Sequence, residues 1–323
     1  MPSLSWDEVR ARRLSRSHLR ERAPADRLVE VVGDVCGVHA QVMGSAELQL
    51  SARVEGITQA DVRAALWERR SLAKTWTLRG TLHIHPAGEL RLWTAARSAV
   101  VGAADREADS LADVEAVVEA IGDALRGRCL LREELAEAVV ARVGEGPREQ
   151  LNSGWGYFLG DAGPEGHVRA PRGLARPAAD LGAARRARFG SRSLTASDAQ
   201  SLFDSLDVAE PELPSPAPLS VRLLPEYDVC VMAFREREHL VPPAVREQVA
   251  AHGKGRYEGP AGVPLLVVDG VAAGVWKRRR TTKRIDISVA PARKLTHAER
   301  EGIDVEAERI GAFYGLEPGL EIA

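Results

Sequence analysis

The sequence of 323 residues has no apolar run long enough to cross a membrane. Its apolar stretches, such as PLLVVDGVAAGVW at 264–276, are interrupted by Asp and Gly and fall short of the roughly 18 residues that a spanning helix needs. The charged N-terminal segment also lacks the apolar core of a secretory signal. We therefore expect a cytoplasmic protein that does not bind to a membrane.

Cysteine is scarce as well. Cys36, Cys129 and Cys230 stand far apart and form no Cys-x-x-Cys pair, which argues against a zinc site or a disulfide framework. The phosphate-binding loops GxGxxG and GxxxxGK[ST] are missing, and so is the GxSxG turn of serine hydrolases. These absences argue against nucleotide hydrolysis and against a Ser or Cys nucleophile, and we expect neither a metal nor a cofactor.

An excess of one charge is also missing, because 44 Lys and Arg residues face 46 Asp and Glu residues, which gives a net charge of −2. Nucleic-acid binding would therefore depend on how the charges are distributed. Basic residues are concentrated in WKRRRTTKR at 276–284, around an expected turn between two strands. Such a hairpin could contact the phosphates or a groove of DNA, or it could be a solvated loop that keeps the protein soluble. Its candidate DNA-binding residues are Lys277, Arg278, Arg279, Arg280, Lys283 and Arg284.

The order of helical and extended patterns predicts winged-helix modules. Three helical patterns within 5–70 precede LAKTWTLRGTLHIHP at 72–86, whose alternation predicts a hairpin. The order starts again with the helical pattern LLREELAEAVV at 130–140 and ends in a Gly- and Pro-rich wing at 163–173. A third start, SLTASDAQSLFDSL at 193–206, soon becomes a Pro-rich linker and looks shortened.

Beyond residue 220 the pattern becomes extended. Strands are expected over 220–234 and 284–291, with Asp269-Gly270 as a two-residue hairpin turn. Thr296 and Glu299 are expected to cap a final helix that ends near Tyr314. The predicted fold class is therefore α+β, with tandem winged-helix modules and a C-terminal β-rich region closed by a helix. The predicted domains are 1–98 and 99–192, each a winged-helix module, and 193–323, a shortened third module with the β-rich region.

Two pairs of polar residues are candidates for chemistry. His83 and His85 have the spacing of two metal ligands on one strand face, but no third ligand is close in the sequence, so hydrogen-bonded strand histidines are the favoured interpretation. His39 and Gln41 follow the helical pattern that begins near Ala25, and both are expected to point outward at its end. Taken alone, this second pair is more often an ordinary polar helix end than a catalytic pair.

Four stretches of the chain together resemble the bacterial AlkZ-like winged-helix DNA glycosylases, and they occur in the same order as in that family. TWTLRGTLH, within 72–86, is the most specific of them. The resemblance implies a C-shaped assembly of winged helices whose concave basic surface holds duplex DNA. The matching stretches are VCGVHAQVMGSAELQLSAR, LAKTWTLRGTLHIHP, VRLLPEYDVCVMAFRERE and VVDGVAAGVWKRR.

The resemblance also implies a catalytic motif of two polar residues that flank an apolar residue. Many members have two glutamines, whereas this sequence has His39, Ala40 and Gln41. The His-first variant resembles members that protect antibiotic producers against bulky intercalating agents that alkylate N7 of guanine. The expected partner is thus double-stranded DNA with an alkylated guanine, bound by a monomer.

Two neutral side chains could suffice for this reaction. An N7-alkylated guanine is cationic and leaves without a general acid, so the remaining requirement is a positioned water molecule. His39 could act as its general base and Gln41 could orient it. The nearest lysine in the sequence is Lys74, so Schiff-base strand cleavage is not indicated and a monofunctional glycosylase is expected. The alternative is a non-enzymatic DNA-binding protein built on the same modules, such as a regulator or a drug-sequestering factor.

Overall fold

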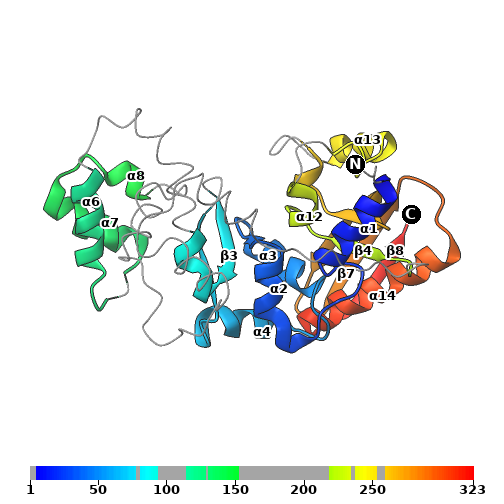
Figure 1. Ribbon diagram of the computed structural model, residues 1–323, viewed down its shortest axis with the longest axis horizontal. Coiled ribbons are helices and arrows are strands. Elements are labelled where there is room, and N and C mark those ends of the chain that lie inside the picture. The colour runs from blue at the N-terminus through cyan, green and yellow to red at the C-terminus, as the bar shows by residue number, and fades with distance from the viewer. Residues whose placement is uncertain are drawn as a thin grey trace. The chain divides into compact units, whose positions relative to one another are not determined.

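The computed structural model describes residues 5–77, 81–93, 114–128, 130–152, 218–233, 237–252 and 259–323. The chain divides into two compact units, and Figure 1 labels most of their helices and several of their strands. Unit 1 combines Met1–Arg69 with Ala209–Ala323, and unit 2 is Arg70–Val208. The predicted domain boundaries after residues 98 and 192 both lie outside the described residues, so the three-domain division stays a prediction.

The described part of unit 1 contains a five-stranded sheet in the order β4-β5-β6-β7-β8. Neighbouring strands are antiparallel except β7 and β8, which are parallel and are joined by the helix α14 (His297–Tyr314). Asp269 and Gly270 have φ angles of 47° and 80° and form the predicted tight turn between β5 and β6. The strands are β4 (Val221–Leu224), β5 (Leu265–Val268), β6 (Val271–Arg280), β7 (Arg284–Pro291) and β8 (Glu317–Ile322).

Helices cover this sheet and extend the core. α14 packs against β4, β7 and β8, and Gly302 permits the close approach, because a Cβ there would lie 2.6 Å from Val221 Cγ2. Leu14, Val245 and Val275 share one buried cluster that joins α1 and α13 to β6. Besides α14, the α-helices described in unit 1 are α1 (Trp6–Arg16), α2 (Leu28–Asp34), α3 (Met43–Ser51), α4 (Gln59–Arg63), α12 (Val229–Met232) and α13 (Pro243–His252).

Side-chain caps begin several of these helices, including the predicted cap at Thr296. Ser5 with Glu8 and Thr296 with Glu299 both form complete capping boxes. Thr58 caps α4, which continues into a π-helical turn over Ala64–Glu68. Among the described helices, none combines the length and the apolar content needed to cross a membrane.

Unit 2 contains a hairpin and a small helical core. β2 (Leu72–Trp76) and β3 (Leu82–Pro86) pair antiparallel, which confirms the predicted hairpin. α6 (Val114–Ala124), α7 (Arg132–Val143) and α8 (Arg148–Asn152) follow, and α7 confirms the helical pattern at 130–140. Their buried residues include Val117, Ile121, Leu135, Val139 and Leu151. The predicted wing at 163–173 and the third start at 193–206 lie outside the described residues.

Two sequence predictions need correction. The helix expected from about Ala25 to His39 ends at Asp34, because Cys36 and Gly37 have φ angles of 57° and 90° that a helix cannot accommodate. After this reversal the chain forms the short strand β1 (Val38–His39). The strand expected over 220–234 stops at Leu224, since Pro225 follows and Asp228 caps the short helix α12.

Candidate functional site

The two candidate catalytic residues occupy different environments. His39 lies on β1 and is only 5% exposed, and Ala40 is fully buried. Gln41, at the next turn of the chain, is exposed. The expectation that both side chains point outward is therefore confirmed for Gln41 and wrong for His39, because the turn at Cys36 and Gly37 directs the chain inward before β1.

The backbone of His39 is fixed by a buried glutamine of α3. Gln49 Nε2 donates to the His39 carbonyl oxygen at 3.2 Å, and Gln49 Oε1 accepts from the Val229 backbone N–H at 3.3 Å. Gln49 has no exposed surface. One side chain thus ties β1 and α12 together across α3, and these segments are far apart in the sequence.

The imidazole of His39 contacts the ring of Tyr227. The ring centroids lie 5.3 Å apart and the planes are tilted by 44°. Tyr227 has a φ angle of 62°, a left-handed conformation that costs a non-glycine residue on the order of 1 kcal/mol. Its backbone N–H donates to the Ala261 carbonyl at 2.6 Å.

A buried ion pair holds the residue after Tyr227. Asp228 accepts two hydrogen bonds from Arg53, at 2.7 and 2.8 Å, and neither side chain has exposed surface. Burial opposes the charge on Arg53, but the Asp228 carboxylate outweighs it and raises the pKa of Arg53. The ion pair anchors the chain directly beside the strained Tyr227, so the ring against His39 sits on a rigid support.

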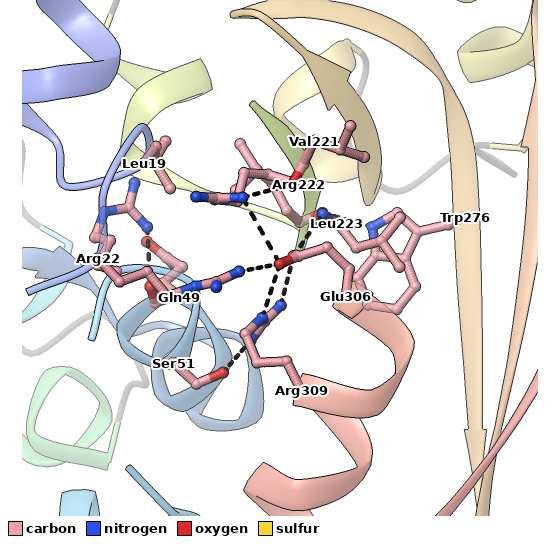
Figure 2. Close-up of polar contacts among 12 residues, drawn as sticks. Leu19, Arg22, Gln49, Ser51, Val221, Arg222, Leu223, Trp276, Glu306 and Arg309 are labelled. Atoms are coloured by element: carbon pink, nitrogen blue, oxygen red, sulfur yellow. Dashed lines mark hydrogen bonds and ion pairs between the residues drawn. The ribbon is translucent and has the colours of Figure 1, made fainter. Parts of the chain in front are cut away.

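A second buried cluster holds α3 against α14. Figure 2 shows Arg22, Arg222 and Arg309 directed at the Glu306 carboxylate, which is fully buried. Arg309 also donates to Ser51 Oγ at the end of α3. Burial disfavours the charge on Glu306, but Arg309 and Arg22 outweigh this and lower its pKa. Burial and the neighbouring guanidinium groups lower the pKa of Arg222 to about 10.

The six basic candidates of the β6–β7 hairpin differ in their surroundings. Five of them are exposed, namely Lys277, Arg279, Arg280, Lys283 and Arg284. Arg278 is half-buried and donates to both oxygens of Glu226 at 3.1 Å. Arg284 pairs with Asp286 at 2.8 Å, and the Arg280 guanidinium lies 5.0 Å from the Tyr314 ring centroid. The structure therefore places all six on one hairpin but leaves them unequally available to a ligand.

A cavity of about 380 Å³ opens beside the start of α3, and we call it the α3 cavity. Residues of α3, α4, β6, β7 and α14 line it. Two of them, Met43 and Gly44, follow Gln41 closely in the sequence. Its lining also includes charged and aromatic side chains and a glycine, namely Glu47, Arg63, Arg278, Arg280, Tyr314 and Gly44.

The histidine pair of β3 has the surroundings of a structural pair. His85 is buried, lies 3.0 Å from Thr77 Oγ1, and stacks on Trp93 with centroids 4.7 Å apart. Burial and the neighbouring His83 lower the pKa of His85 to about 3. Within the described ranges, no group of three His, Cys, Asp or Glu residues could hold a metal ion. Burial likewise raises the pKa of Cys230 to about 12, which makes this thiol a poor nucleophile.

The comparison with known proteins assigns the chain to a family. The family model described as DNA glycosylase AlkZ-like matches residues 32–190 and 163–313, which together span most of the chain. The chain belongs to the AlkZ-like DNA glycosylase family. The first matched stretch includes His39 and Gln41, and the second includes Tyr227 and the basic hairpin.

Two comparisons each find a similar protein from Streptomyces sahachiroi. An "Interstrand DNA cross-link repair glycosylase" is 34% identical over 171 residues, which are 48% of this chain and 43% of that protein. The matched segment thus spans less than half the length of that curated relative. The solved structure of "Streptomyces sahachiroi DNA glycosylase AlkZ" superimposes with a TM-score of 0.69 at 22% identity and covers all of both chains. This likeness confirms the predicted α+β fold of the AlkZ-like glycosylases.

The residues that support His39 were not identified from the sequence. Gln49 and Tyr227 lie in segments that were singled out for the family resemblance, but nothing in their local pattern shows that they meet His39. The available signal was composition, because α3 carries Ser45, Glu47, Gln49 and Ser51 at every second position. All four are buried in the structure. Polar residues that recur along a helix can therefore belong to a buried hydrogen-bonded network and not only to an exposed helix face.

Proposed function

We propose that the protein is a monofunctional DNA glycosylase that hydrolyses the N-glycosidic bond of bulky N7-alkylguanine adducts in duplex DNA. The observation that carries the proposal is the position of the His39-Ala40-Gln41 motif, with a rigidly held imidazole followed by an exposed carboxamide. Membership of the AlkZ-like family supports the reaction type. The name of the Streptomyces sahachiroi relative, which refers to cross-link repair, supports a bulky alkylated substrate.

Each residue of the motif has a separate task in this proposal. An N7-alkylguanine carries a positive charge and needs no proton before it leaves, so the protein has only to supply a water molecule near the anomeric carbon. His39 accepts a proton from that water, and Tyr227 and Gln49 keep its ring and backbone in place. Gln41 orients the water by donating and accepting hydrogen bonds. The products are the alkylated base and an abasic site.

The biological role that fits this chemistry is self-resistance to a DNA-alkylating natural product. Such a product intercalates and attaches to guanine N7, and the adduct is too bulky to enter a small closed pocket. The exposed Gln41 and the exposed cations of the β6–β7 hairpin favour a substrate that stays outside the protein core. A monomer in the cytoplasm would meet this task, because both catalytic residues come from one chain.

The proposal is tested with a duplex that carries a single N7-alkylguanine. After incubation with the protein, heating in mild alkali cuts the strand at abasic sites, and the cut fraction reports base release. We expect His39→Ala and Gln41→Ala each to lower the single-turnover rate by about 100-fold or more. General-base catalysis by His39 contributes about 10²–10⁴, and loss of the water orientation by Gln41 should cost about 100-fold. His297→Ala is the matched control, because His297 lies on α14 and its side chain is 89% exposed.

The outcomes separate the candidate functions. Release by the wild type at a rate unchanged in both variants would remove the motif from the mechanism. Tight binding to the adducted duplex without any release would favour a non-enzymatic DNA-binding protein that sequesters the lesion. A panel of N7-guanine adducts of different size then identifies the substrate.

A further inference from the structure

The α3 cavity has the size and composition of a built binding site. Its volume of about 380 Å³ lies within the roughly 300–1,000 Å³ that is usual for small-molecule sites. Met43 and Ile285 supply apolar wall, and Tyr314 supplies an aromatic wall. The lining side chains come from segments that are far apart in the sequence, so the cavity exists only in the folded protein.

The charges around the cavity leave an excess of cations. Three guanidinium groups line it, those of Arg63, Arg278 and Arg280, and two carboxylates pair with them. Glu47 binds Arg63 at 2.8 Å, and Glu226 binds Arg278 at 3.1 Å. Three positive and two negative charges leave a net charge of +1. Among the described residues, Arg280 has no carboxylate within ion-pair distance, so it carries this excess.

Arg280 is also oriented for an anion. Its guanidinium lies 5.0 Å from the Tyr314 ring centroid, and stacking of this kind leaves the N–H groups at the edge of the guanidinium free for a bidentate contact. Burial raises the pKa of Tyr314, so its hydroxyl stays neutral and can donate a hydrogen bond. The first turn of α3, with Gly44, adds the partial positive charge of a helix start, and Val42 provides no side-chain cap there.

We propose that the α3 cavity binds one phosphodiester group of the DNA strand, with Arg280 as its main contact and Arg63 and the first turn of α3 as further donors. The apolar wall would then lie against the adjoining sugar. This inference rests on the proposed function only in taking DNA as the ligand. Because α3 begins two residues after Gln41, a phosphate bound there fixes the register of the strand relative to the catalytic motif. The cavity thus makes the placement of the sugar beside His39 and Gln41 independent of base sequence.

The test is a scan with methylphosphonate linkages, in which one phosphate of an adducted duplex at a time is replaced by a neutral group. For the wild type we expect one linkage near the lesion at which replacement weakens binding by about tenfold, as for the loss of one charge-assisted contact. Arg280→Gln should bind the unmodified duplex about tenfold more weakly and lose no further affinity at that linkage. The slope of the logarithm of its binding constant against the logarithm of the salt concentration should also be less steep, by about 0.9.

Arg279→Gln is the matched control. Arg279 is adjacent on β6, exposed, and directed to the opposite face of the strand, so it does not line the cavity. This variant should keep the sensitivity of the wild type at the same linkage. If Arg280→Gln keeps it as well, or if the wild type shows no sensitive linkage, the proposal is overturned.

Gly44→Ala gives a second test without a change of charge. A Cβ at Gly44 meets no atom within 4 Å, and alanine is favoured over glycine in a helix, so the variant should fold with unreduced stability. Its methyl group would stand in the cavity and should weaken binding at the sensitive linkage, whereas unchanged binding there would count against the proposed phosphate position. Base release is measured in parallel on the same duplexes. If Arg280→Gln abolishes the sensitivity at one linkage but no base is released, the glycosylase proposal is refuted and the phosphate site is supported. If base is released but no linkage depends on Arg280, the phosphate site is refuted and the glycosylase proposal is supported.

Discussion

The buried carboxylate of Glu306 interacts with three guanidinium groups. Replacing it with a neutral side chain should therefore lower the free energy of unfolding strongly. Glu306 accepts from Arg309 at 2.9 and 3.1 Å, from the Leu223 backbone N–H at 3.0 Å, and from Arg22 (Figure 2). Arg222 lies 4.0 Å away. In Glu306→Gln one carbonyl oxygen replaces two carboxylate oxygens, and the new amide N–H groups face other donors. The cluster then keeps its three positive charges and loses its central negative charge.

The magnitude follows from the bonds that are lost. The Gln carbonyl can satisfy about two of the four donors, so two charge-assisted hydrogen bonds disappear, each worth about 1.5–3 kcal/mol. The sum, about 3–6 kcal/mol, agrees with the roughly 3–5 kcal/mol that is usual when one partner of a buried ion pair is removed. Typical domains have unfolding free energies of about 5–15 kcal/mol, so the change should be a large fraction of the total.

The assay is urea unfolding followed by circular dichroism, together with hydrogen exchange of the β4 amides. Glu306→Gln should shift the unfolding midpoint strongly and should speed exchange at Leu223, whose N–H loses its acceptor. Glu308→Gln on the same helix is the control, because Glu308 is exposed and its neutralisation should change stability by less than about 0.5 kcal/mol. A loss below about 1 kcal/mol for Glu306→Gln would show that the cluster is solvated or rearranged and that the buried-charge reasoning does not apply.

Two further predictions concern the catalytic support and the acid response. Tyr227→Ala should lower the single-turnover rate of base release by about tenfold or more, as expected when a catalytic group loses its orientation, whereas Tyr227→Phe should keep most of the rate; equal losses in both would exclude ring contact with His39 as the reason. Glu299, held by Arg293 and by the helix cap, has a pKa lowered from 4.5 to about 2. Its stabilising effect is therefore complete above about pH 4.5 and is lost as the pH falls toward 2. The melting temperature of the wild type should exceed that of Glu299→Gln near neutral pH, and the difference should shrink below about pH 4.5; a constant difference would contradict the lowered pKa.

The parts of the fold that depend on local chemistry were predictable from the sequence. The cap at Thr296 and the turn at Asp269-Gly270 lie where the sequence places them, because each involves only residues that are close in the chain. The basic hairpin also follows from local alternation and its turn. Strand β8 was missed, since Pro318 and Gly319 interrupt the extended pattern.

The identity of the candidate site residues stays a prediction, and nothing in the sequence indicated their environment. The resemblance singled out His39 and Gln41, but the burial of His39 depends on a left-handed turn at Cys36. Cysteine has no preference for this conformation that would allow the turn to be predicted from the sequence. α3 escaped prediction because its polar residues are paired with distant partners, for example Gln49 with Val229. An amphipathic pattern reveals a helix that has one buried and one exposed face, whereas α3 is buried on every face from Ser45 to Ser51.

The parallel pairing of β8 with β7 has a mechanical consequence for the basic hairpin. β7 is hydrogen-bonded along both edges, to β6 and to β8, whereas the end of β6 from Lys277 to Arg280 pairs with β7 alone. The hairpin that carries Lys277, Arg280 and Arg284 is therefore held by β8 as a third strand and is not a loose flap. The backbone of the hairpin is already ordered in the free protein, so binding of a ligand there would cost little conformational entropy. In the proposed complex with DNA this hairpin would act as a rigid element, so the duplex would have to adjust its shape more than the protein.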